Sequence, residues 1–340
     1  MGQHLLSDHT TLRLGGPAPL WLSHTHEADW PDLARTAAAH VERPFTLGGG
    51  SNTLAPDQGT TRPVIHMATR GIRTRYRHDG QVEVTVAAGH PLTELVAHTV
   101  AEGLSGIEYL GGIPGTAGAA PVQNAGAYGQ EIADRLAAVT AHDWATGRTT
   151  RVPAAECGFG YRTSRFKQQP GRWTILSLTL HLTPSTAAAP VTYQHLATAL
   201  RAPLGSRPPL AEAAAAVLHD RACRGLLLPQ TGHDHRQAGS CFLNPTVTDD
   251  QARILRSQGA PVHRTPLGTW RASAGWLLEA CGYRPGTAIT CGVSCSAHRT
   301  LTLTAQRGAT AHSFHSALAT MAGRVSMATG VRLQAEPAAV

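Results

Sequence analysis

Two glycine-rich segments carry the clearest chemical signal in this 340-residue sequence. Segment 112–129 reads GIPGTAGAAPVQNAGAYG, and segment 48–52 reads GGGSN. Small residues let the main chain approach a large ligand closely, and main-chain N–H groups can then bind phosphate oxygens. Neither segment is followed by the Lys-Ser/Thr pair of a P-loop,. Together the two segments predict a dinucleotide cofactor rather than a P-loop nucleotide.

The elements expected to position these segments are both helical and extended. A helical pattern over 30–41 precedes a strand at 45–47, which leads into the first glycine segment,. Alternating apolar residues at 82–86 predict a half-buried strand, and a helix from Pro91 to Gly103 leads into the second segment,. Later patterns predict strands on both sides of 145–147, at 176–182 and at 300–304, and helices at 211–222, 273–281 and 311–328. This mixture indicates an α+β fold.

Length and composition indicate a globular protein of two domains, and the Ala- and Pro-rich segment 183–210 predicts their junction in its later part,. The net charge of +7 comes almost wholly from arginine, because Lys167 is the only lysine. The sequence lacks a basic run interleaved with aromatic residues, so nucleic-acid binding is not expected. Its apolar runs also fall short of the roughly 18 residues that span a membrane, and a cytoplasmic location is expected.

The cysteines and histidines do not predict a metal centre. The six cysteines form no C-x-x-C pair, and we interpret them as small buried thiols,. The run His233-Asp234-His235 invites a metal interpretation, but a solvated polar loop is the preferred one.

Several blocks, in the same order and spacing, identify a family that this chain resembles. The blocks are 9–18, 48–52, 112–129, 159–167, 238–245, 273–279 and 330–336. In these blocks the chain is similar to the UDP-N-acetylenolpyruvoylglucosamine reductases, flavoenzymes of peptidoglycan precursor synthesis.

The resemblance implies a fold, a cofactor and a reaction. It implies an FAD-binding domain of the vanillyl-alcohol-oxidase type over 1–205, a smaller α+β substrate-binding domain over 206–325, and residues 326–340 returning to the first domain. The implied reaction uses NADPH to reduce an enolpyruvyl ether on a UDP-sugar, giving UDP-N-acetylmuramate. Neither glycine segment contains a His or Cys that could tether a flavin, so FAD is expected to bind non-covalently.

The same resemblance implies three catalytic residues. Arg162 resembles the arginine that holds the substrate carboxylate and stabilises the developing enolate. Ser240 resembles the proton donor, a role that a weakly acidic hydroxyl fills only against a strongly basic carbon. Glu336 resembles the second electrostatic partner, acting in its protonated form if it is desolvated beside the enolate.

Binding residues follow in the same way. The residues implied at the cofactor are Gly48, Gly49, Gly50, Ser51, Asn52, Ile113, Pro114, Gly115, Gly118, Ala119, Asn124, Gly126, Ala127 and Tyr128. Those implied at the substrate are Tyr161, Tyr193, Arg221, Arg224 and Asn244. Tyr128 either stacks on the cofactor or packs to close the loop. Tyr193 either folds over the substrate or packs, and Arg221 and Arg224 are either diphosphate ligands or solvated helix residues.

The sequence also departs from the family pattern. Cys241-Phe242-Leu243 follows Ser240 where two aromatic residues and a polar residue are usual, Gln334-Ala335 precedes Glu336, and Thr60 replaces a phenylalanine. These departures leave open a specialised paralogue that reduces a related enolpyruvyl nucleotide. A non-catalytic flavoprotein and a superfamily oxidase are further alternatives, and the retention of Arg162, Ser240 and Glu336 argues against the non-catalytic one.

Overall fold

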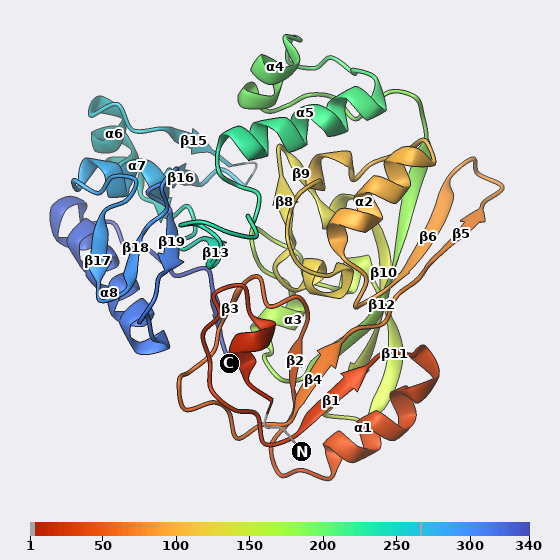
Figure 1. The fold of residues 1–340 in the computed structure, drawn as a ribbon. Helices are drawn as coiled ribbons and strands as arrows, with labels where there is room; N and C mark the ends of the chain where they lie inside the picture. The colour runs from red at the N-terminus through yellow and green to blue at the C-terminus, as the bar shows by residue number, and fades with distance from the viewer. Residues whose placement is uncertain (1–3, 266) are drawn as a thin grey trace. The chain divides into compact units, whose positions relative to one another are not determined.

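The computed structural model describes residues 4–265 and 267–340, which fall into two compact units (Figure 1). The larger unit combines Ala18–Gly50 with Thr61–Leu227. The smaller unit combines residues 4–17, Ser51–Thr60 and Leu228–Val340. The chain therefore passes between the units several times, and each unit is built from segments that are distant in sequence.

The larger unit contains a parallel and an antiparallel sheet. The parallel sheet has the order β1-β4-β2, and the antiparallel sheet has the order β11-β10-β12-β6-β5, with β7 paired to β12. Its strands are β1 (Trp21–His24), β2 (Phe45–Leu47), β4 (Val64–Met67), β5 (Ile72–Tyr76), β6 (Val82–Ala87), β7 (Leu104–Ser105), β8 (Gly126–Ala127), β9 (Gln130–Glu131), β10 (Leu136–Asp143), β11 (Arg148–Pro153) and β12 (Trp173–Pro184). Its helices are α1 (Trp30–Ala38), α2 (Leu92–Ala101), α3 (Arg165–Gln168), α4 (Gln194–Leu200) and α5 (Leu210–Cys223).

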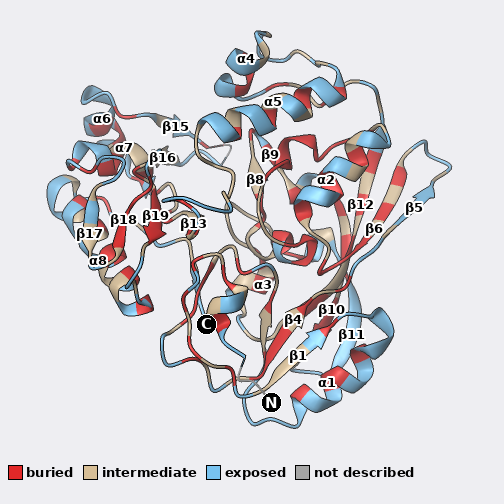
Figure 2. Ribbon diagram, in the orientation of Figure 1, coloured by how far each residue is buried: buried red, intermediate tan, exposed pale blue. Residues whose placement is uncertain are grey.

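Burial explains why the central strands of the antiparallel sheet form where they do. Val82, Val84 and Val86 of β6 are fully buried, and Leu178 and Leu180 of β12 are buried on the same core. Edge strand β11 is mostly exposed, as Figure 2 shows. Period-two alternation therefore places one apolar face of the sheet in the core, as the sequence predicted.

The smaller unit holds a four-stranded antiparallel sheet of order β13-β19-β18-β17, a three-stranded sheet of order β14-β16-β15, and the short pair β20-β3. Its strands are β3 (Thr53–Leu54), β13 (Gln237–Ser240), β14 (Thr246–Val247), β15 (Val262–Arg264), β16 (Trp270–Ala272), β17 (Ala288–Thr290), β18 (Val293–Cys295), β19 (Thr302–Ala305) and β20 (Ala338–Ala339). Its helices are α6 (Asp249–Ser257), α7 (Ala274–Ala280) and α8 (Ala311–Thr329).

Helix α8 forms as its sequence pattern predicted. Phe314, Leu318, Met321 and Val325 are buried on one face,. The Thr310 side chain caps the first turn, and the Asp57 carboxylate accepts hydrogen bonds from the N–H groups of Ala311 (2.7 Å) and His312 (3.1 Å),. This charge-assisted cap is one reason why Ser51–Thr60 belongs to the smaller unit.

The two units divide the chain differently from the expected domain boundaries. Residues 206–227 lie in the larger unit, because Leu210, Ala213 and Val217 of α5 are buried against its core. Residues 326–340 lie in the smaller unit, where β20 pairs in parallel with β3. The segment expected to be the domain junction contains α4, which the sequence pattern did not reveal.

Thiol burial is only partly as expected. Cys157, Cys241, Cys281 and Cys295 are buried, but Cys223 and Cys291 are exposed, so the interpretation of all six as buried thiols is wrong for these two. Cys223 ends α5 on its outer side, and Cys291 lies in the turn between β17 and β18. Across the described residues, no helix is both long enough and apolar enough to cross a membrane.

Candidate active site

Gly48 and Gly49 of the first glycine segment lie against the second glycine segment in the larger unit. The first begins at the carboxyl end of β2 in the parallel sheet, the edge at which α/β sheets bind ligands,. A Cβ added to Gly49 would lie 3.1 Å from the Cα of Gly115, and one added to Gly48 would lie 2.6 Å from Oγ1 of Thr116. The two loops can therefore meet only because these positions lack side chains.

The second glycine segment is anchored to the end of β6. The N–H groups of Ala117 and Gly118 donate to the carbonyls of His90 (2.7 Å) and Ala88 (2.9 Å). A Cβ on Gly118 would come within 2.5 Å of the Cβ of Ala88. The two packed loops, which we call the main-chain cradle, carry few side chains, as is expected of segments that approach the pyrophosphate of a dinucleotide such as FAD,.

Three residues expected at the site adopt a left-handed backbone that is rare for residues other than glycine. Asn124, Tyr128 and Arg162 have φ values of 49°, 50° and 53°, and all three belong to the larger unit. Such residues cost of order 1–3 kcal/mol each and persist only where surrounding contacts hold them. The contacts that hold these three residues in the left-handed conformation therefore belong to the expected site.

Arg162 is tied to the second glycine segment. Its Nη1 donates to the carbonyl of Asn124 (3.2 Å), and its Nη2 donates to the carbonyl of Gly126 (2.7 Å). The Lys167 ammonium donates to the Arg162 carbonyl (3.0 Å), and the guanidinium lies 5.7 Å from the Tyr161 ring centroid. The expected carboxylate-binding arginine thus lies next to the expected cofactor loop, with Tyr161 beside it.

Asn124 shapes the same loop from inside the fold. Its side-chain amide donates to Glu131 Oε2 (2.5 Å) and to the Gly160 carbonyl (3.2 Å), and its side-chain oxygen accepts from the Ala133 N–H (3.2 Å). The residue is 1% exposed. These bonds explain how a non-glycine residue is held left-handed here, and a direct contact with a cofactor stays a prediction.

A second cluster in the larger unit gathers Tyr128, Tyr193, Arg221 and Arg224 around a residue that the sequence did not single out, Asp220. The Tyr128 hydroxyl donates to Asp220 Oδ2 (2.7 Å), and Arg224 Nη1 lies 3.1 Å from the same oxygen. The Tyr193 ring meets the Tyr128 ring edge-on at 5.7 Å. Asp220 and Arg224 are four residues apart at the end of α5, a spacing that brings side chains together on a helix and is visible in the sequence,.

Burial sets the electrostatics of this cluster. Burial, followed by the hydrogen bond to Asp220, raises the pKa of Tyr128, so this hydroxyl stays protonated at neutral pH,. Burial lowers the pKa of Arg221, which is 8% exposed. Arg221 is therefore not a solvated helix residue. Arg224 differs from it, because 33% of the Arg224 side chain is exposed to solvent.

In the smaller unit, a β-bulge precedes Ser240 at the end of β13. Strand β13 pairs with β19 in the register Gln237↔Thr304 and Ser240↔Thr302, with one irregularity between these pairs. Gly239 lies within the bulge at φ +72°, where a side chain would be strained. A bulge changes the direction in which the next side chain points, so it sets the orientation of Ser240.

The chain's C-terminal segment pairs with the chain that directly follows Ser240. The Glu336 N–H donates to the Cys241 carbonyl (2.9 Å), and the Leu243 N–H donates to the Gln334 carbonyl (3.0 Å). Asn52 completes the group, because its side-chain amide donates to the Glu336 carbonyl (3.3 Å). Two expected catalytic residues and one expected cofactor residue therefore share one part of this unit.

A further expected residue of this unit, Asn244, has a structural contact. Asn244 Oδ1 accepts from the Ala274 N–H (2.9 Å) at the start of α7. This bond satisfies one of the N–H groups that lack a partner in a first helical turn. A substrate contact of Asn244 stays a prediction.

The interpretation of residues 233–235 as a solvated loop is wrong for Asp234. Asp234 is 6% exposed, and its carboxylate accepts from Ser296 Oγ (2.6 Å) and the Ala297 N–H (3.0 Å) and lies 2.8 Å from His233 Nδ1. Although burial alone would raise its pKa, these partners hold the pKa of Asp234 below its usual range. The carboxylate is buried because it links the chain before β13 to the chain after β18.

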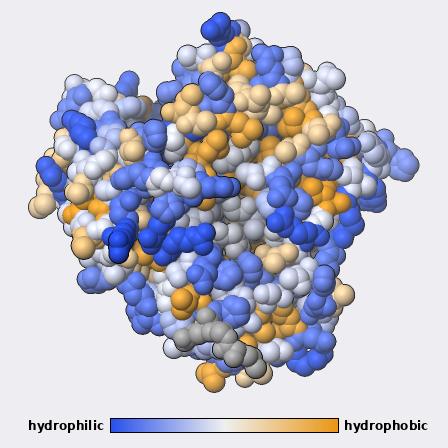
Figure 3. Space-filling view, in the orientation of Figure 1, coloured by the Kyte–Doolittle hydropathy of each residue, from blue (hydrophilic) through white to orange (hydrophobic). Residues whose placement is uncertain are grey.

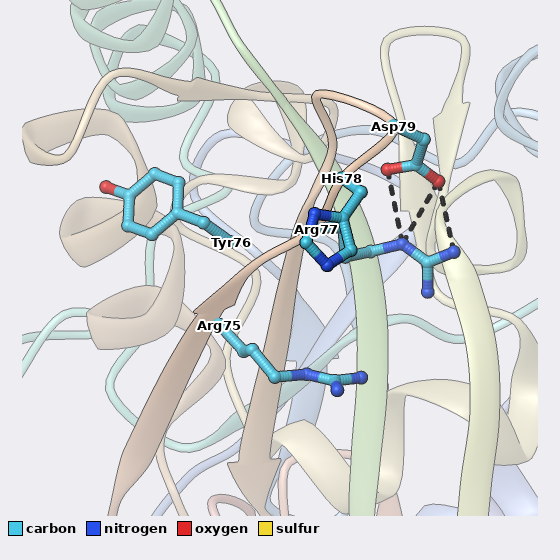
Figure 4. Close-up of a pocket in the computed structure, with 5 residues that line it drawn as sticks. All are labelled: Arg75, Tyr76, Arg77, His78 and Asp79. Atoms are coloured by element: carbon cyan, nitrogen blue, oxygen red, sulfur yellow. Dashed lines mark hydrogen bonds and ion pairs between the residues drawn. The ribbon is translucent and has the colours of Figure 1, made fainter.

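One cavity in the described part of the chain is lined by none of the expected catalytic residues. A cavity of about 330 Å³ lies at the β5–β6 hairpin, lined by Arg75, Tyr76, Arg77, His78 and Asp79 (Figure 4). Arg77 pairs there with Asp79 (3.0 Å), so this cavity is a feature of the hairpin. Polar side chains predominate on the face in Figure 3, and orange apolar groups interrupt them.

Comparison with known proteins first defines a class. Residues 20–153 match the FAD binding domain family. This match covers the first glycine segment and the whole of the second, so the chain is a flavin-binding oxidoreductase whose FAD-binding domain includes the cradle described above. It confirms the predicted α+β fold class.

The second family match identifies a particular kind of flavoenzyme. Residues 230–340 match the C-terminal domain family of UDP-N-acetylenolpyruvoylglucosamine reductase. Reductases of that name from Salinispora arenicola and Streptomyces coelicolor are 42% and 38% identical to this chain. The alignments cover 89% and 98% of this chain and 85% and 88% of those relatives. The chain belongs to the UDP-N-acetylenolpyruvoylglucosamine reductase family, which confirms the resemblance seen in the sequence.

A solved structure agrees at the level of the fold. The crystal structure of the UDP-N-acetylenolpyruvylglucosamine reductase (MurB) from Thermus caldophilus superposes with a TM-score of 0.66 at 24% identity. The superposition covers 99% of this chain and 98% of that one.

Proposed function

We propose that this protein reduces UDP-N-acetylglucosamine enolpyruvate to UDP-N-acetylmuramate, with non-covalent FAD as the bound cofactor and NADPH as the hydride donor. Family membership supports the reaction class, and the main-chain cradle supports the cofactor. The reaction is a step of peptidoglycan precursor synthesis, and the proposal places it in the cytoplasm.

One observation in particular supports a catalytic role over a binding role. The hydrogen bond from the Glu336 N–H to the Cys241 carbonyl pairs the main chain of Glu336 with the residue that directly follows Ser240. A proton donor and an electrostatic partner are the two groups that an enolate intermediate needs from this side.

The chemistry that FAD supplies when bound is hydride transfer. In the proposed reaction, the terminal carbon of the enol ether gains a hydride, and the carbon beside the carboxylate gains a proton. Arg162 binds the substrate carboxylate and stabilises its developing charge. Ser240 Oγ donates the proton, and Glu336 stabilises the enolate beside it.

The departures from the family pattern at Cys241 and Phe242 do not by themselves indicate a modified substrate. Cys241 is 1% exposed and Phe242 is 2% exposed, and both belong to the core of the smaller unit. Their side chains therefore fill the interior, and a change of residue type there alters packing rather than ligand contacts. The specialised paralogue remains the alternative that a substrate test must address.

The test is an anaerobic stopped-flow pair on the purified FAD-loaded protein. NADPH should bleach the flavin absorbance band, and UDP-N-acetylglucosamine enolpyruvate should then restore it rapidly. Bleaching without recovery would replace the proposed substrate with another enolpyruvyl acceptor. A protein that binds no flavin would refute the proposal altogether.

A further inference from the structure

Asp220 occupies a position that the proposed reaction does not explain. One of its two carboxylate oxygens, Oδ2, makes both contacts: it accepts a hydrogen bond from the Tyr128 hydroxyl (2.7 Å) and pairs with Arg224 Nη1 (3.1 Å). The Asp220 side chain is 13% exposed, and neither partner is fully exposed. A carboxylate is an unexpected group beside two arginines that are expected to bind a diphosphate, because it repels the ligand they would attract.

Arg221 shows that this cluster has more hydrogen-bond donors than acceptors. Its Nη2 donates to the Leu226 carbonyl (3.0 Å), but its buried Nε has no hydrogen-bond partner among the described residues. A Cβ added to Gly112 would lie 3.0 Å from this Nε and 2.6 Å from Leu227. Leu227 and the Arg221 guanidinium therefore pack closely against the main chain at Gly112, a position that a residue with a side chain could not fill without displacing them.

The charges of the cluster also indicate that Arg221 and Arg224 need an anion nearby. The cluster contains the guanidiniums of Arg221, which is 8% exposed, and of Arg224. The Asp220 carboxylate pairs with Arg224. Burying a cation without an anion nearby is costly, so Asp220 lowers the free energy of the ligand-free protein. An anionic ligand arriving at Arg221 and Arg224 would take over part of that role.

We propose that Asp220 is an internal counter-anion that holds Tyr128 and Arg224 in place when no ligand is bound and that limits how tightly this cluster binds a diphosphate. The inference rests on the proposed function, because the ligand it takes is the diphosphate of a UDP-sugar. Asp220 is thus a positioning residue: it keeps two ligand-binding groups oriented, at the expense of repulsion towards the ligand's own negative charge.

The experiment uses FAD-loaded protein and inorganic pyrophosphate as the probe. Asp220→Asn keeps an oxygen that can accept the Tyr128 hydrogen bond and removes the charge. We expect its melting temperature without ligand to fall below that of the wild type and its pyrophosphate dissociation constant to fall on the order of tenfold. Pyrophosphate should therefore raise the melting temperature more in this variant than in the wild type.

Two further variants separate charge from position. Glu212→Gln removes an exposed carboxylate from the first turn of the same helix, and it should leave pyrophosphate affinity unchanged. Asp220→Ala removes the acceptor as well as the charge, so the Tyr128 hydroxyl loses its partner. It should lower the melting temperature further than Asp220→Asn and tighten pyrophosphate binding less.

Pyrophosphate binding by Asp220→Asn that is no tighter than in the Glu212→Gln control would overturn the proposal. Absence of pyrophosphate binding in both proteins would overturn it equally. Both results are independent of turnover, so tightened binding in a protein that does not reduce the UDP-sugar would contradict the proposed function and leave the role of Asp220 standing.

Discussion

The larger and smaller units hold their expected reactive residues by opposite means. In the larger unit, Asn124, Tyr128 and Arg162 themselves adopt the left-handed backbone, and side-chain hydrogen bonds hold each of them there. In the smaller unit, Ser240 lies on a paired strand, and the left-handed residue is its neighbour Gly239. The expected ligand-binding groups are thus built on strained loops, whereas the proposed proton donor is oriented by strand pairing and one bulge.

The largest expected effect tests the smaller unit. Ser240→Ala should slow reoxidation of the reduced flavin by substrate on the order of 10²–10⁴-fold, because it removes the proton donor. Reduction of the flavin by NADPH should be unchanged, which stopped-flow absorbance measures directly. Ser257→Ala, at an exposed position of α6, is the matched control. Equal slowing of both half-reactions by Ser240→Ala would remove the serine from this role.

The next effect tests the larger unit. Arg162→Lys keeps a positive charge but cannot donate to the Asn124 and Gly126 carbonyls while also presenting a planar fork to a carboxylate,. We expect kcat/KM to fall about 100-fold, with KM raised, in steady-state assays. Arg165→Lys, three residues along, should have little effect. If Arg162→Lys also proved silent, the strained arginine would hold the loop and not the substrate.

A third change tests the bulge itself. Gly239→Ala and Gly259→Ala place a side chain at φ +72° and φ +84°, both in open space, so each should cost roughly 1–2 kcal/mol of unfolding free energy,. Only the first should also slow flavin reoxidation by substrate, because only that residue precedes Ser240. Chemical denaturation and stopped-flow absorbance give the two readouts. Equal kinetics in both variants would show that the bulge does not orient the serine.

The smallest effect concerns acid stability of the larger unit. His24 is 1% exposed, burial lowers its pKa, and neither ring nitrogen has a hydrogen-bond partner among the described residues. Its ring packs edge-on against Trp30 at 5.2 Å. Because the folded state binds this proton less readily than the unfolded chain, its contribution to stability is present above about pH 6.5 and is lost as the pH falls below it.

Melting curves measured between neutral pH and pH 5 check this expectation. The variant His24→Phe cannot be protonated and should show a shallower loss of stability with acid than the wild type. Identical pH dependence of the two proteins would show that His24 is not the group that titrates.

Much of the local structure could be predicted because it depends on neighbours in sequence. The alternation at 82–86, the helix from Pro91 and the apolar face of α8 are confirmed, since each pattern specifies which side of the element is buried,. The glycine segments predicted a close approach of main chain to a large ligand, which stays a prediction, and the structure shows the two loops in contact with each other. The family followed from ordered blocks of residues, independently of any fold.

Contacts between distant residues were decided only by the tertiary structure. Tyr128 and Asp220 are 92 positions apart, and Asn52 and Glu336 are 284 apart, so no local pattern reports that they meet. The burial of Asp234, the helix cap supplied by Asp57 and the membership of α5 in the larger unit are of the same kind. The sequence by itself determined which residue types and which local elements are present. Which polar groups share a buried environment, and therefore which charges need a partner, was decided by long-range packing, because desolvation arises only once distant segments come together.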